Sequence, residues 1–117
     1  MTWLAILFTG VGLLLVVLGV PLVQRRVGPN LLYGLRVPAT LADEWVWYEA
    51  NAASGRDLIT LGAVEMILAL GLSLFGRLPV EFYTLSNAGF LVLGTLAFAV
   101  IGWRRANWLL RSRRAIE

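Results

Sequence analysis

The sequence predicts an all-α membrane protein with three transmembrane helices and a short amphipathic helix at the interface between the first two. Of the 117 residues, 59% are hydrophobic, and the mean hydropathy is +0.78. A domain of this size cannot bury that much apolar surface in water. Three apolar stretches also approach the length of roughly 20 helical residues that crosses a hydrocarbon core. We therefore expect residues 1–117 to form a single membrane domain.

The three predicted spans are residues 3–23, 58–75 and 85–103. The first and third contain no charged residue, and the second contains one, Glu65. The first span has no basic residues before it and is long for the apolar region of a signal peptide, so we expect it to remain in the protein. The connection at 76–84 is short, which makes the second and third helices antiparallel neighbours.

The arginines indicate the orientation. Nine of the ten basic residues lie in segment 24–57 or in the tail 104–117, and only Arg77 lies elsewhere. By the positive-inside rule, the N-terminus is outside, while segment 24–57 and the tail are cytoplasmic. The net charge of +3 suggests contact with anionic lipid headgroups. A nucleic-acid partner is not expected, because the basic residues flank spans and form no separate domain.

The composition removes most catalytic chemistry. The chain contains no cysteine and no histidine, which excludes disulfides, metal sites built on thiolate or imidazole, and catalysis by either side chain. Asp43, Glu44 and Glu49 have no partnered nucleophile or metal-ligand set. We expect no enzyme activity, no metal and no cofactor.

Each span has a stripe of mostly small residues at helical spacing, which allows close helix contacts in a membrane. The stripes are Thr9, Gly12, Val16 and Gly19 in the first span, Gly62, Glu65, Ala69, Ser73 and Gly76 in and after the second, and Asn87, Leu91, Gly94, Phe98 and Gly102 in the third. We expect these faces to meet inside the bundle.

Glu65 lies near the middle of the second span, where a charged carboxylate costs about 2.5 kcal/mol or more. Thr9 and Thr95 are its candidate hydrogen-bond partners from the neighbouring spans. Two interpretations stay open: a proton-linked or ligand-binding carboxyl, or a protonated acid that holds the helices together.

Segment 24–57 divides into a loop and a helix. Pro29 and Pro38 bracket a stretch that is not expected to be one helix. Thr40 and the acidic residues after it predict a helix start near Leu41, and Gly55 permits a bend before the second span. Leu41, Trp45, Tyr48 and Ala52 form the apolar stripe of this interfacial helix.

Trp47 and Asn51 are four residues apart and share a separate face, which we expect to cover the loop at 30–36. In the alternative interpretation, the aromatic residues are interfacial anchors, and Arg36 pairs with Asp43 or Glu44.

These residues carry a resemblance. The run Pro29-Asn30, Tyr33-Gly34-x-Arg36-x-Pro38-x-Thr40-Leu41, followed by Trp47-Tyr48-x-x-Asn51 and Gly55-Arg56, resembles the signature loop of the bacterial SdpI family, named for an immunity protein against a sporulation-delaying toxin. The resemblance implies a multi-pass protein of the bacterial cytoplasmic membrane. In the founding type, the protein confers resistance to a secreted peptide toxin and holds a repressor at the membrane. The binding residues it implies are Asn30, Tyr33, Gly34, Arg36, Pro38, Thr40, Trp47 and Asn51.

The favoured function is a small, non-catalytic binding or immunity-type membrane protein whose cytoplasmic loop contacts a protein partner or lipid headgroups. One alternative is an accessory subunit of a larger membrane complex. Another is an oligomeric transporter that uses Glu65. The expected partners are membrane lipids, a second copy of the chain, and either other membrane subunits or a toxin or repressor.

Overall fold

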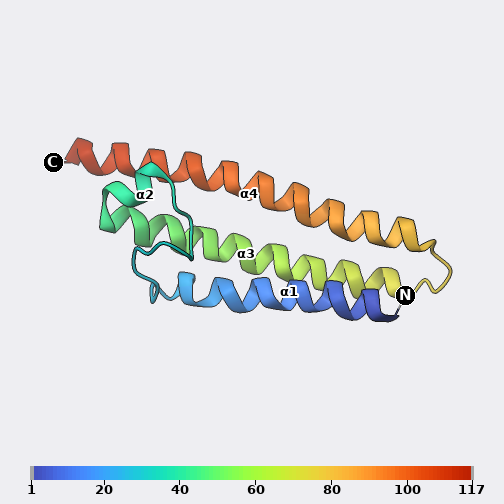
Figure 1. The fold of residues 1–117 in the computed structure, drawn as a ribbon. Helices are drawn as coiled ribbons and strands as arrows, with labels where there is room; N and C mark the ends of the chain where they lie inside the picture. The colour runs from blue at the N-terminus through green and yellow to red at the C-terminus, as the bar shows by residue number, and fades with distance from the viewer. Residues whose placement is uncertain (1, 117) are drawn as a thin grey trace.

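The structure, a computed structural model, describes residues 2–116 and is all-helical over that range (Figure 1). Its helices are α1 (Thr2–Val23), α2 (Pro38–Ala42), α3 (Glu44–Ser73) and α4 (Val80–Ile116). Of these, α1 and α4 are long and apolar enough to cross a membrane. The last 18 residues of α3 contain three charged side chains, Arg56, Asp57 and Glu65. The all-helical fold is confirmed, and α3 as the third span stays a prediction.

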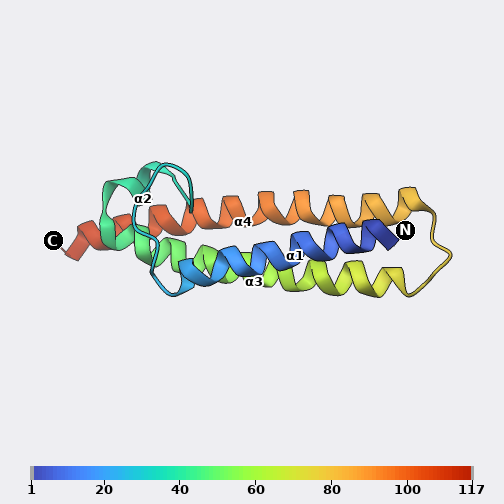
Figure 2. The same ribbon diagram turned by 60° about the horizontal axis from the view of Figure 1, so that its bottom comes forward.

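The three long helices form one elongated bundle of 59 × 22 × 20 Å. In Figures 1 and 2, α3 lies beside both α1 and α4, and both run antiparallel to it. The N-terminus and the α3–α4 connection lie at one end, while α2, the loop before it and the C-terminus lie at the other. Segment 24–57 and the arginine-rich tail therefore share one end of the molecule.

Glycines bring α1 and α3 into close contact. A Cβ atom at Gly12 would lie 2.6 Å from the carbonyl oxygen of Gly62, and one at Gly19 would lie 2.6 Å from that of Gly55. Such distances leave no room for any side chain, so the two backbones approach as closely as the missing Cβ atoms allow. Gly12, Gly19 and Gly62 of the predicted small faces do meet, whereas Gly76 follows the end of α3, is exposed and has no neighbour within 4 Å of its Cβ position.

The predicted break at Gly55 is wrong. The interfacial helix was expected from Leu41 to a bend at Gly55, but α2 ends at Ala42, and α3 runs unbroken from Glu44 through Gly55. The break falls instead at Asp43, whose backbone is extended and whose carboxylate accepts hydrogen bonds from the first amides of α3. Gly55 is buried against α1, so its missing side chain serves helix contact and not a bend.

The helix α4 continues through most of the predicted tail, as far as Ile116. Its C-terminal part packs on α2 and the start of α3. The buried residues of this contact are Ala39, Val46, Ala50 and Ala106. The tail is therefore part of the folded bundle up to residue 116.

Candidate functional site

Asn30 shapes the loop between α1 and α2, residues 24–37. Its Oδ1 accepts hydrogen bonds from the amides of Leu32 at 2.8 Å and Tyr33 at 2.6 Å. Its Nδ2 donates to the carbonyl oxygens of Gly28 and Tyr33, both at 2.9 Å. These four bonds close a tight turn. The turn leaves Leu31 and Leu32 pointing outward, 79% and 96% exposed.

Asn51 holds the same loop from α3. Its buried Oδ1 accepts from the amide of Leu35 at 2.6 Å, and its Nδ2 donates to the carbonyls of Leu35 at 3.3 Å and Trp47 at 3.0 Å. Gly34 has a φ of +106°, and a Cβ atom there would lie 2.8 Å from Asn51 Oδ1. Only glycine suits this backbone conformation and this space.

Trp47 lies beneath the loop, fully buried, and its Nε1 donates to the carbonyl of Val27 at 2.8 Å. The indole is therefore part of the loop's support and not a membrane-interface anchor. Thr40, also buried, accepts from the amide of Val37 at 3.1 Å, and its hydroxyl is 2.9 Å from the carbonyl oxygen of Leu35. Pro38 supplies the first residue of α2.

Tyr33 ties the loop to α1. Its hydroxyl donates to the carbonyl oxygen of Leu18. Burial raises the pKa of the Tyr33 phenol above its ordinary value of 10.0. The phenol therefore stays protonated at neutral pH and keeps its donor. With Asn30 and Asn51, Tyr33 makes the loop an ordered element held from both neighbouring helices.

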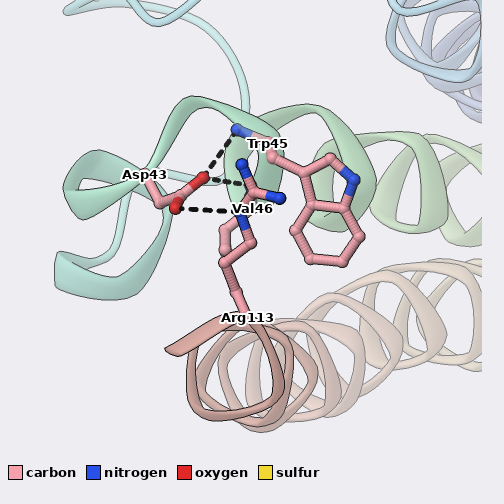
Figure 3. A network of polar contacts seen from close by, with 4 residues as sticks. All are labelled: Asp43, Trp45, Val46 and Arg113. Carbon is pink, nitrogen blue, oxygen red and sulfur yellow. Dashed lines mark hydrogen bonds and ion pairs between the residues drawn. The ribbon is translucent and has the colours of Figure 1, made fainter. Parts of the chain in front are cut away.

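Arg36 is exposed and makes no ion pair within residues 2–116. The alternative pairing with Asp43 or Glu44 is wrong, because Arg36 forms an ion pair with neither residue and Asp43 pairs with another arginine. Its Oδ2 is 3.4 Å from Nε of Arg113 in α4, whose guanidinium lies 5.3 Å from the centroid of the Trp45 ring. Figure 3 shows this contact between the two helix ends.

The environment of Asp43 favours its charged form. Desolvation raises its pKa, but hydrogen bonds from the amides of Val46 and Trp45 and the guanidinium of Arg113 outweigh that effect, so the pKa lies below the ordinary 3.8. Asp43 thus caps the start of α3 and at the same time pairs with Arg113 at the end of α4 (Figure 3). Sequence reasoning missed this pair, since the two residues are 70 positions apart.

A pocket of about 350 Å³ opens beneath the loop, between α1, α3 and α4. Tyr33, Gly34 and Leu35 cover one end, and most of the other lining residues are apolar. Asp57 brings a carboxylate to the lining, and its Oδ2 is 3.2 Å from Nη1 of Arg105. The loop residues therefore bound a space that is apolar inside and charged at one edge.

Glu65 is fully buried, and neither carboxylate oxygen has a hydrogen-bond partner within residues 2–116. The predicted hydrogen bond from Thr9 or Thr95 is therefore not formed. Thr95 is exposed, and its neighbour Gly94 lies against Leu61, one turn before Glu65. The part of the chain that the structure describes holds no group of three or more acidic residues able to bind a metal ion.

These features define a class: a small helical membrane protein with an ordered loop fastened to its long helices. The model of the SdpI/YfhL protein family matches residues 26–107, from the loop to the C-terminal part of α4. The chain belongs to this family, and the resemblance seen in its loop residues is confirmed. Comparisons with curated proteins and with solved structures found no match.

Proposed function

We propose that this SdpI-family chain is a non-catalytic, immunity-type protein of the bacterial cytoplasmic membrane, and that its 24–37 loop contacts a protein partner or lipid headgroups. In this proposal, α1, α4 and the apolar part of α3 cross the membrane with the N-terminus outside, so that the loop is cytoplasmic. The observation that carries the proposal is the ordered loop, which presents apolar and cationic side chains outward.

Leu31, Leu32 and Arg36 form this contact surface. The two leucines are almost fully exposed although the turn beneath them is fixed by Asn30. Arg36 is exposed and without an ion pair among the described residues. Adjacent apolar side chains and a guanidinium suit a partner that offers an apolar surface next to a carboxylate or phosphate. A loop that is already ordered also loses less entropy on binding.

The test separates contact from folding. Leu31→Ser with Leu32→Ser, and separately Arg36→Ala, change side chains that support nothing else in residues 2–116, so the purified variants should unfold at the wild-type temperature. Resistance of the producing cells to secreted peptide toxin, or retention of anionic lipid during purification, should fall. Arg77→Ala, an exposed arginine at the opposite end, is the matched control. Wild-type resistance and lipid retention in both loop variants would refute the proposed contact.

The same purification separates the alternative functions. Larger membrane subunits that co-purify in mild detergent would favour an accessory subunit. A homo-oligomer that carries an ion flux in vesicles, abolished by Glu65→Gln, would favour a transporter. A protein isolated with lipid alone supports the immunity-type proposal.

A further inference from the structure

Four buried side-chain oxygens have no hydrogen-bond partner within residues 2–116. They are Thr9 Oγ1, both carboxylate oxygens of Glu65, and Asn87 Oδ1, one residue from each long helix. A buried polar group without a partner destabilises the folded protein. In native proteins, one explanation of such a group is a bound water or ion. A single bound water or ion can serve all four oxygens only if they lie close together.

The packing of α1 on α3 places Thr9 level with Glu65. Gly12 faces Gly62, and Gly19 faces Gly55, so each step forward along α1 matches one step back along α3. Thr9 is three residues before Gly12, and Glu65 is three residues after Gly62. The two side chains therefore lie at the same height in the bundle.

The packing of α4 on α3 places Asn87 at that height as well. The Tyr83 hydroxyl donates to the carbonyl oxygen of Ala69 at 2.8 Å. Asn87 follows Tyr83 by one turn, and Glu65 precedes Ala69 by one turn of the antiparallel helix. Nδ2 of Asn87 donates to the carbonyl of Tyr83 at 2.9 Å. That bond uses a donor of the amide and leaves Oδ1 free, and both Asn87 and Glu65 are fully buried.

We propose that Thr9, Glu65 and Asn87 form an exchangeable site for one small cation inside the bundle, either a proton carried by Glu65 or a sodium ion held by the four oxygens. Hard cations prefer carboxylate, amide and hydroxyl oxygens. A carboxylate at this depth also needs one positive charge to offset its burial. With a proton, the Glu65 hydroxyl becomes a donor that can serve Asn87 Oδ1, which otherwise faces only acceptors.

No charged side chain of the packed helices supplies that charge. At this level, α1 contributes Thr9, and its described residues contain no ionisable side chain. From α4, Asn87 and the neutral phenol of Tyr83 face the site. The nearest charges on α3 are Arg56 and Asp57, two turns away, and Asp57 pairs with Arg105. This cation site is separate from the loop surface, so it goes beyond the proposed function.

The test measures thermal unfolding of the purified protein from mildly acidic to mildly alkaline pH, in sodium chloride or in choline chloride of equal ionic strength. A ligand at 100 times its Kd raises the ratio of folded to unfolded protein about 100-fold. Sodium should stabilise the protein at alkaline pH if sodium is the bound cation. If the bound cation is a proton, lowering the pH should stabilise the protein, and sodium should have no effect.

The variants assign the response to this site. Glu65→Gln keeps the shape without the carboxylate and should lose the response, whereas Glu81→Gln, at an exposed acid near the start of α4, should keep it. Thr9→Val keeps the carboxylate and should weaken sodium binding, which gives a second readout if Glu65→Gln does not fold. Identical responses of wild type and Glu65→Gln would show that the response arises at another group. A wild type indifferent to both cations would show a permanently neutral carboxyl. Either result overturns the site.

Discussion

Replacing Asn51 with alanine should release the 24–37 loop from α3. The change removes the acceptor 2.6 Å from the Leu35 amide and both bonds donated by Nδ2. A buried group left without its partner costs about 1–3 kcal/mol. At about 2 kcal/mol, the loop should open about 30-fold more often, since each 1.4 kcal/mol is roughly a factor of ten.

Limited trypsin digestion measures this opening, because Arg36 lies in the loop. When cleavage is slow, its rate follows the open population. Cleavage after Arg36 should be about 30-fold faster in Asn51→Ala than in wild type, while cleavage after Arg111 in the same digest should not change. Asn107→Ala, a half-buried asparagine of α4, is the matched control. A wild-type cleavage rate after Arg36 in Asn51→Ala would refute the reasoning.

Two further predictions concern the bundle itself. Gly12→Ala places a Cβ atom 2.6 Å from a carbonyl oxygen of α3 and should lower the free energy of unfolding by about 1–3 kcal/mol. The control is Gly10→Ala, whose Cβ atom meets nothing within 4 Å. Equal thermal unfolding of the two variants would contradict the α1–α3 contact. Because the pKa of Asp43 lies below 3.8, its stabilisation is complete above that pH and is lost as the pH falls through the lowered value. Asp43→Asn keeps an acceptor for the helix cap but has no titratable group. The unfolding temperature of this variant should therefore fall less on acidification than that of wild type. An equal fall would show that Asp43 contributes nothing to the pH dependence of stability.

The long helices and their contact faces could be predicted because both depend on local sequence. Apolar runs set the helices, and glycines seven residues apart set the face where α1 meets α3. The covering of the loop by Trp47 and Asn51 was also readable, since residues four apart share one side of a helix. The prediction at Gly55 was wrong because glycine occurs both at bends and at close helix contacts. Only the position of Gly19 on α1 shows that Gly55 makes a close contact.

Which polar side chains lie beside Glu65 inside the bundle could not be predicted in the same way. Placing Thr95 near Glu65 assumed that the third span begins at residue 85, but α4 begins at Val80. The earlier start, together with the end of α3 at Ser73 and not at residue 75, shifts the register by about two turns and brings the neighbourhood of Asn87 to that level. Small errors in where a helix begins are ordinary at the sequence level, yet each one changes which side chains face one another.

The unbroken course of α3 has a mechanical consequence. Asn51, which grips the loop, and Glu65, which lies among buried oxygens, stand on one continuous helix about 21 Å apart at 1.5 Å per residue. A hinge at Gly55 would have isolated the two ends. A straight rod instead carries any tilt or axial shift of the loop directly to the level of Glu65, so a force applied at the loop end of the bundle reaches the buried oxygens without a joint to absorb it.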